Sequence, residues 1–369
     1  MAGNVSSGNG STSNHSLAMD CIHSTPAEDA IAVTIWGLLL LYGLLTNILT
    51  LLAIYRSRSL RSSTSYWLIF SVSVCDSLMI LISLFHLLPA AYFHESFVDV
   101  VAFRNAFAIF AYNIFWYTGV LGLLAMAVNR FVSIIFPTEY PAYFSRERTY
   151  GVIAMLFLGG FIIAVPALFE CCHTVWNHHC FYTAFKHEGA NEHYGMVDLI
   201  VNSITVITML LCYSAILGKV RQSRLHTQRH QGTRYVLQNG ALLSKSQTIH
   251  TRELRLFIQF FLVSVIFTAT FLTWQVTFRL ATGSLWLSFT MTSLFFVNNG
   301  TNPTVYIIFN PAIRNEMAAI LRICCPGVKC LLSPQSSREP TGNLEGNRSR
   351  SPTPLPVRRS YSQLSKEDR

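Results

Sequence analysis

Charged side chains are scarce in this sequence. Asp, Glu, Lys and Arg make up only 12% of its 369 residues, whereas 51% are hydrophobic and the mean hydropathy is +0.39. An ordinary soluble domain carries about 25% charged residues, so the composition excludes that class and indicates a membrane protein. The sequence also contains no nucleophile arrangement, metal-ligand set or phosphate-binding loop, and we therefore expect neither an enzyme nor a cofactor.

Apolar segments recur along the chain, and each is long enough to cross a bilayer as a helix of about 20 residues. The sequence predicts an all-α membrane protein with a seven-helix bundle in residues 31–325, between a polar tail of residues 1–30 and a disordered tail of residues 326–369. The predicted spans are residues 31–55, 64–88, 105–134, 150–169, 196–220, 253–280 and 284–309.

Lys and Arg are concentrated on one side of the predicted bundle, after the first span and between the fifth and sixth spans. Because cytoplasmic loops are enriched in these residues, we expect the N-terminus outside the plasma membrane and the C-terminus inside. The polar, basic residues 221–250 predict a flexible cytoplasmic loop. The net charge of +9 fits a face that meets anionic lipid and an acidic partner, and no nucleic-acid ligand is expected.

The N-terminal tail has three N-glycosylation sequons, at Asn4, Asn9 and Asn14. Sequons grouped in one short polar tail favour an extracellular location. The tail contains no apolar signal-peptide core. We therefore expect the first span to act as the signal anchor.

A few ionisable side chains interrupt the apolar spans. Arg130 ends the third span, Asp76 lies within the second, and Asp198 lies in the outer third of the fifth. A charge in hydrocarbon is costly unless it is paired, so each of these residues is a functional hypothesis. The alternatives are a snorkelling anchor for Arg130 and a protonated carboxyl with a packing role for Asp76.

Two motifs carry a resemblance to a known family. The run Asn129-Arg130-Phe131, with a proline seven residues after Arg130, resembles the Asp-Arg-Tyr box of rhodopsin-like (class A) G protein-coupled receptors. The residues Asn302-Pro303-Thr304-Val305-Tyr306, at the inner end of the last span, match the Asn-Pro-x-x-Tyr motif of these receptors. The variants at positions 129 and 131 look most like the divergent invertebrate serpentine chemoreceptor class x, close to neuropeptide-like receptors.

The resemblance implies a receptor in which an extracellular ligand shifts the population of states and activates a heterotrimeric G protein. It pairs Arg130 with Glu253, and it implies that the inactive state is held less firmly because Asn129 replaces an acid. The resemblance implies that Tyr213 and Tyr306 change position during activation, next to the helix interruption at Pro303. It groups Asn47, Asp76 and Asn298 in a polar cluster for water or sodium, although Gly119 stands where a hydroxyl is usual.

The sequence departs from the family at several positions. The cysteine that ties the third helix to the second extracellular loop is replaced by Asn105, and Phe271 stands where a tryptophan is usual. No proline lies between Pro166 and Pro303, so a proline hinge in the sixth span is not supported. The remaining outer cysteines allow three full pairings, with free thiols as the alternative; they are Cys21, Cys171, Cys172 and Cys180.

The ligand pocket implied by the resemblance is an aromatic cup with polar contacts. Asp198 is the leading contact, and its alternative role is a structural pair with His86 or Arg279. Acids outnumber bases on the predicted outer surface, which favours a basic or amidated peptide, while a small chemosensory molecule or lipid-facing aromatic packing stays open. The candidate contacts are His86, Tyr112, Asn113, Trp116, Asp198, Phe271, Trp274, Gln275, Phe278, Arg279 and Phe296.

The loop after the fourth span is rich in histidine, which binds zinc and titrates near neutral pH. A proton or zinc sensor is therefore one alternative, and solvated histidines without a role are another. Two further alternatives are a scavenger that does not signal and a transporter, although no internal repeat supports the latter. The histidines are His173, His178, His179, His187 and His193.

The C-terminal segment begins with an amphipathic stretch from Pro311, which predicts a short helix lying on the inner membrane surface. Cys324 and Cys325 at its end are candidates for palmitoylation, or plain lipid-facing thiols. The tail beyond is rich in serine, and its phosphorylation could recruit arrestin after receptor kinases act.

Overall fold

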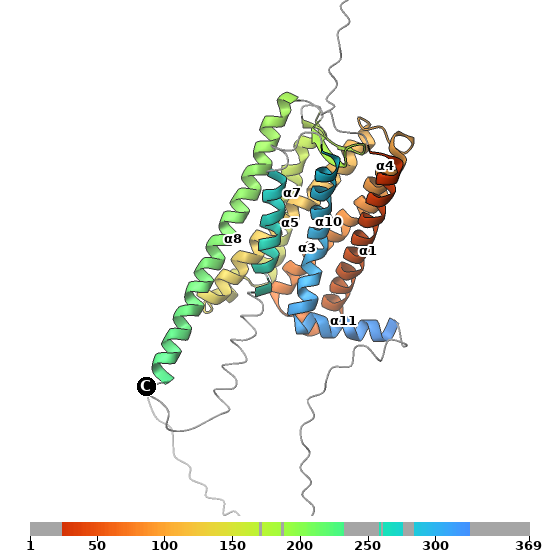
Figure 1. The fold of residues 1–369 in the computed structure, drawn as a ribbon. Coiled ribbons are helices and arrows are strands. Elements are labelled where there is room, and N and C mark those ends of the chain that lie inside the picture. Colours follow the sequence, from red (N-terminus) through yellow and green to blue (C-terminus); the bar gives the residue numbers. More distant parts are fainter. Residues whose placement is uncertain are drawn as a thin grey trace, which may run out of the picture. The chain divides into compact units, whose positions relative to one another are not determined.

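A computed structural model describes residues 24–169, 172–185, 188–231, 258–259, 261–275 and 284–324. Its long helices run side by side, and a last helix crosses their ends (Figure 1). The long helices are α1 (Pro26–Arg56), α3 (Thr64–Ile82), α5 (Phe103–Ile135), α7 (Arg146–Ala164), α8 (Glu188–Gln231), an unlabelled helix Phe261–Gln275 and α10 (Leu285–Phe309), and the crossing helix is α11 (Pro311–Cys324).

Short elements connect these helices. They are α2 (Arg58–Arg61), the π-helix η1 (Ser83–Leu87), α4 (Leu88–Phe93), the 3-10 helices η2 (His94–Ser96) and η3 (Val165–Leu168), α6 (Tyr140–Tyr143), and the strands β1 (Thr174–Asn177) and β2 (Tyr182–Phe185).

Within the described residues, five helical segments are long and apolar enough to cross a membrane, and the sixth predicted span is represented by the shorter apolar helix Phe261–Gln275. Large apolar side chains such as Leu38 and Leu211 stay about two-thirds exposed on the outside of the bundle. Hydrophobic residues on the outside as well as the inside of a helix are typical of a membrane span. The prediction of an all-α membrane bundle is therefore confirmed.

Two helices extend beyond their predicted ends. The second span continues through η1, α4 and η2 as one segment, Thr64–Ser96. Pro89 has no N–H to donate, and just before it the Leu88 N–H reaches back five residues to the Ser83 carbonyl, which is the π-helical pattern. Helix α8 runs to Gln231, so the flexible loop predicted from residue 221 was wrong over its first turns.

Helices α5 and α7 approach each other closely at Gly160. Gly160 on α7 packs so tightly on α5 that an added Cβ would lie 2.1 Å from Thr118 Oγ1 and 2.7 Å from the carbonyl oxygen of Ile114. Only glycine leaves room for this contact between helix backbones. This contact fixes the position of α5, the third predicted span. Helix α5 contributes residues to the ligand cavity and to the polar core.

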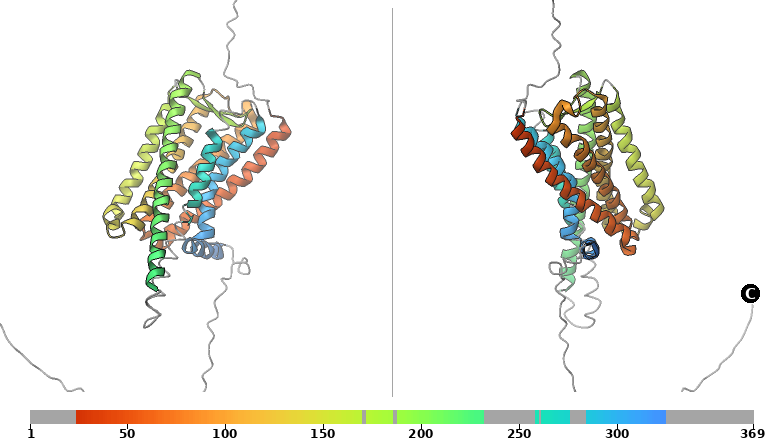
Figure 2. Two further views of the ribbon diagram at one scale, coloured as in Figure 1. Left: turned by 60° about the vertical axis from the view of Figure 1, so that its left-hand side comes forward. Right: turned by 90° about the vertical axis from the view of Figure 1, so that its right-hand side faces the viewer.

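A β-hairpin covers one end of the bundle, and α11 lies at the other (Figure 2). Strands β1 and β2 pair antiparallel, with Trp176 opposite Thr183. Thr292 of α10 donates a 2.6 Å hydrogen bond to the Phe181 carbonyl, and the Trp36 ring packs edge-on against both Trp176 and Phe181. These contacts hold the hairpin against α1 and α10.

Asn105 ties the hairpin to α5. Its side chain is fully buried, and its Nδ2 donates to the carbonyl oxygens of Trp176, at 3.0 Å, and Val100, at 2.8 Å. Hydrogen bonds of a buried amide thus join α5 to the loop at the position where the resemblance expects a disulfide. Cys172 and Cys180 are each disulfide-bonded.

Candidate functional site

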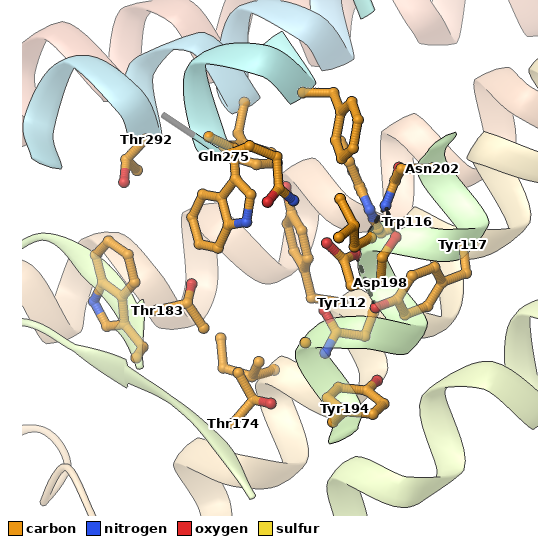
Figure 3. Close-up of a pocket in the computed structure, with 18 of the residues that line it drawn as sticks. Tyr112, Trp116, Tyr117, Thr174, Thr183, Tyr194, Asp198, Asn202, Gln275 and Thr292 are labelled. Atoms are coloured by element: carbon orange, nitrogen blue, oxygen red, sulfur yellow. Dashed lines mark hydrogen bonds between the residues drawn. The ribbon is translucent and has the colours of Figure 1, made fainter. Parts of the chain in front are cut away.

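A cavity of about 300 Å³ opens among the helices beneath the hairpin (Figure 3). Its walls come from η1, α5, α8, α10, the helix Phe261–Gln275 and both strands, and most of the side chains are aromatic or aliphatic. This volume is at the lower end of the range for small-molecule sites. The lining includes Tyr112, Asn113, Trp116, Tyr117, Trp176, Tyr194, Asp198, Asn202, Phe271, Trp274, Gln275, Phe295 and Phe296.

Asp198 is the only carboxylate among the described residues that line this cavity, and no Lys, Arg or His is among them. Its Oδ1 accepts hydrogen bonds from the Tyr117 hydroxyl, at 3.1 Å, and from Asn202 Nδ2, at 2.9 Å (Figure 3). Both donors are neutral. The carboxylate is therefore held in place by hydrogen bonds without a cationic partner in the described lining.

The alternative pairing of Asp198 with His86 was wrong. His86 Nε2 lies 3.1 Å from Asn105 Oδ1, and His86 is not among the residues that line the cavity. It belongs to the contacts that hold α5 under the hairpin. Arg279, the other proposed partner, and Phe278 lie outside the described residues.

The cavity combines predicted contacts with others that the sequence did not suggest. Asn202 follows Asp198 by four residues, so helical spacing places the two side chains on the same face. This spacing alone would have predicted Asn202 as a cavity residue. Thr174, Trp176 and Thr183 come from the hairpin, for which the sequence carried no such signal. The predicted contacts in the lining are Tyr112, Asn113, Trp116, Asp198, Phe271, Trp274, Gln275 and Phe296.

A polar core lies deeper in the bundle. Asn302 Nδ2 donates a 2.8 Å hydrogen bond to Asp76 Oδ2, and both side chains are buried. Pro303 has no N–H for the Asn299 carbonyl four residues earlier, and Asn47 Nδ2 donates to that carbonyl at 2.9 Å. Asn47 of α1 therefore satisfies the carbonyl that Pro303 leaves free, while Asn302 bonds to Asp76.

Asn298, Gly119 and Asp76 line a second, small space of about 10 Å³. This is at the lower limit for a single water molecule. Gly119 has no atom within 4 Å of where a Cβ would be, so the missing hydroxyl leaves open space on that side. The geometry leaves little room for the larger water or sodium cluster that the resemblance implies.

The α11 end of the bundle contains the Asn129–Phe131 run. Arg130 is 95% buried, and Asn129 accepts a 2.7 Å hydrogen bond from Ser65 Oγ and donates one of 3.2 Å to the Tyr140 hydroxyl. Phe131 packs against the main apolar core. The neutral Asn129 thus joins α5 to α3 and α6 by hydrogen bonds that need no charge.

Tyr213 of α8 and Tyr306 of α10 are buried in the same apolar core. The Ser264 hydroxyl donates to the Tyr213 oxygen at 3.3 Å, which connects α8 to the helix Phe261–Gln275. Glu253 lies outside the described residues, so its pairing with Arg130 stays a prediction.

Several other predicted sites also lie outside the described residues. The side chain of Cys324 is among them, although its backbone ends α11. The pairing of the outer cysteines stays open, because two of them are not described. The remaining residues are Asn4, Asn9, Asn14, Cys21, Cys171 and Cys325.

This combination of a helical bundle, a cavity under a hairpin and a proline-interrupted α10 with a buried Asp76 defines a rhodopsin-like receptor fold. The structure superimposes on squid rhodopsin with a TM-score of 0.69, covering 82% of this chain and 89% of that one at 16% identity. The chain belongs to the family of serpentine type 7TM GPCR chemoreceptors, Srx, whose profile matches residues 38–310. The expected class is thereby confirmed, and the family is one of receptors rather than enzymes.

Curated relatives agree with this assignment. The chain is 27% identical over 249 residues to cannabinoid receptor 1 of Xenopus laevis, which is 64% of this chain but only 47% of that receptor. It is 24% identical over 328 residues to probable G-protein coupled receptor 19 of Homo sapiens, covering 84% and 71% of the two chains. It is 22% identical over 334 residues to the tachykinin-like peptides receptor 86C of Drosophila melanogaster, covering 82% and 60%. The chain thus spans less than half the length of the first of these relatives.

Proposed function

We propose that this chain is a plasma-membrane receptor, with the hairpin end outside, that binds a cationic ligand in the cavity and activates a heterotrimeric G protein. The observation that supports the ligand class is the carboxylate of Asp198, which is the only one in the described lining of a cavity whose side chains are mostly aromatic or aliphatic. A basic or amidated peptide is the proposed ligand, and its positive end would enter the cavity.

The geometry around Asp198 favours a cation over a neutral ligand. Within the described part of the chain, both side-chain hydrogen bonds to this carboxylate go to Oδ1, which leaves Oδ2 to an ammonium or guanidinium group. Tyr112, Trp116 and Trp274 line the same cavity, and aromatic faces attract cations. An ionised ligand group would therefore replace its hydration by one charge-assisted hydrogen bond and by several ring contacts.

The volume of the cavity limits how much of a peptide it can hold. About 300 Å³ is small even for a drug-sized molecule, so only a terminal residue or two would fit. The rest of the peptide would lie over the hairpin. The Drosophila relative is a receptor for tachykinin-like peptides, which supports the peptide class. The chemoreceptor family supports a small cationic molecule as the second candidate.

Replacing Asp198 by asparagine tests this proposal. In cells that express the full chain, basic and amidated peptides and small amines are screened by G protein activation, and each active compound is titrated on both forms. We expect the Asp198→Asn variant to lose at least 30-fold in potency, because losing one partner of a buried charge pair costs about 2 kcal/mol or more. The screen also separates the two candidate ligand classes.

Asp99→Asn is the matched control for this experiment. It makes the same chemical change at an exposed carboxylate at the hairpin end, whose Oδ1 accepts only the Val101 N–H among the described residues. We expect this control to keep the potency of the wild type. Agonists that activate wild type and Asp198→Asn with equal potency would contradict the cationic-ligand proposal.

A further inference from the structure

Three histidines from separate segments meet at the hairpin end of the bundle. His94 begins η2, whereas His178 and His179 form the turn between β1 and β2. One ring nitrogen from each residue can be chosen so that all three lie within 4.8 Å of one another. The other loop histidine with a described side chain, His173, bonds to the Leu168 carbonyl at 2.9 Å and takes no part.

Three ring nitrogens of His94 and His178 have no hydrogen-bond partner within the described residues. His178 is fully buried, and within the described part of the chain neither of its ring nitrogens has a hydrogen-bond partner. The buried Nδ1 of His94 has none there either. Buried polar atoms are almost always paired, so three orphan nitrogens at one place require an explanation.

The second nitrogen of His94 has a partner of a particular kind. Its Nε2 lies 2.8 Å from Oδ2 of Asp29, and Asp29 is 97% buried on α1. An imidazole that binds a metal commonly has its other nitrogen hydrogen-bonded to a carboxylate, which fixes the ring and the tautomer. Because Nε2 is engaged with Asp29, Nδ1 is the nitrogen of His94 that could bind a metal, and it has no hydrogen-bond partner among the described residues.

The backbone and the packing of the rings fit the same role. His94 has a φ of 49°, an uncommon conformation for a residue other than glycine that is found at functional sites. The ring centroid of His178 lies 5.3 Å from that of His94 and 4.3 Å from that of His179. The three imidazoles are thus close to one another.

We propose that His94, His178 and His179 bind a zinc ion, with Asp29 as the carboxylate that orients His94. Imidazole nitrogen suits zinc, whereas magnesium and calcium prefer oxygen ligands. In a tetrahedral zinc site the ligand atoms lie about 3.3 Å apart, so the rings would have to move inward from their present spacing. Glu95, with Oε1 3.6 Å from Nε2 of His179, or a water molecule would complete the shell.

Zinc at this place would connect the loop at η2 to the hairpin. Thr174 and Trp176 of β1 line the ligand cavity, and the turn with His178 and His179 follows directly after that strand. A bound ion would therefore restrain the β-hairpin, which lies over the cavity. The site is separate from the cavity itself, and zinc binding can be measured without any ligand or G protein.

The test uses the full-length protein purified in detergent through a tag without histidine and freed of metal by a chelator. Zinc chloride is titrated by calorimetry and by thermal unfolding, with magnesium and calcium chloride as comparisons. We expect a saturable rise in Tm with zinc alone, since a ligand that binds only the folded state stabilises it. Cobalt at the same site should show the visible absorption of tetrahedral coordination.

Single substitutions identify the residues that bind zinc. We expect His178→Ala and His179→Ala to lose at least tenfold in zinc affinity and Asp29→Asn about 10- to 100-fold, whereas the control His173→Ala keeps the affinity of the wild type. His179 is partly exposed, at 26% of its side chain, so its variant should fold even if that of the fully buried His178 does not. The rings of His94 and His179 stack with centroids 4.9 Å apart, so ring packing is the alternative explanation of the cluster. If wild type binds no zinc, or if His179→Ala and Asp29→Asn bind it as wild type does, the cluster is ring packing alone and the proposal is wrong.

Discussion

Replacing Gly160 by alanine is expected to remove most of the folded receptor from the cell surface. The new Cβ would lie 2.1 Å from Thr118 Oγ1, 2.7 Å from the Ile114 carbonyl oxygen and 2.8 Å from the Thr118 backbone nitrogen. A side chain can rotate away, but two of these three atoms belong to the backbone of α5. The helices must therefore separate, and we expect a cost at or above the upper end of the usual range for overpacking, about 3 kcal/mol.

Gly151→Ala is the control for this variant. It lies on the same helix, α7, and a Cβ there meets no atom within 4 Å. Alanine in an exposed helix position favours the helix by about 0.5–1 kcal/mol, so this variant should match or exceed the wild type. Surface expression and thermal unfolding in detergent are measured for both variants and for the wild type. Equal losses for the two variants, or none for Gly160→Ala, would show that the α5 and α7 contact is looser than described.

Replacing Asn302 by alanine is expected to destabilise the polar core. Asn302 Nδ2 is the hydrogen-bond donor to the buried Asp76 within the described residues, and a buried polar group that loses its partner costs about 1–3 kcal/mol. In a chain of this size the loss corresponds to a fall in Tm of a few degrees. The double variant Asp76→Ala with Asn302→Ala should lose less than the sum of the single variants, because the two residues interact.

Asn298→Ala provides the comparison on the same helix. Asn298 lies one turn before Asn302 and also beside the small space at Asp76, yet its side chain makes no hydrogen bond in the part of the chain that the structure describes. We expect its effect on Tm to be clearly smaller than that of Asn302→Ala. Additive losses in the double variant, or equal effects of the two asparagines, would mean that the hydrogen bond between Asn302 and Asp76 contributes little.

The sequence predicted the bundle and the buried polar residues because both follow from local rules. Long apolar runs must be helical in lipid, and Asp76 within such a run must face the interior. The partner of the carbonyl freed by Pro303 was not predictable in the same way. Asn47 and Asn302 are both amides near that level of the bundle, and only the packing of α1 against α10 decides which one reaches the Asn299 carbonyl.

The hairpin and the histidine cluster were the least predictable parts. Two strands of four residues each give too short a pattern to distinguish from an irregular loop. The turn between them needs a positive φ at Phe181, a residue that does not signal one. His94 joins His178 and His179 from a segment more than eighty residues earlier, and no spacing within the loop could have indicated it.

The central claim, that this chain is a signalling receptor, is tested most directly by G protein activation without ligand. An energy-transfer reporter is read in cells that express wild type, Arg130→Ala or Glu253→Ala at matched surface levels. We predict a wild-type signal above that of untransfected cells, since Asn129 supplies no second anion to hold Arg130. Glu253→Ala should raise the signal and Arg130→Ala should reduce it to the untransfected level. If all three match untransfected cells, the account is contradicted and a receptor-like scavenger becomes the better description.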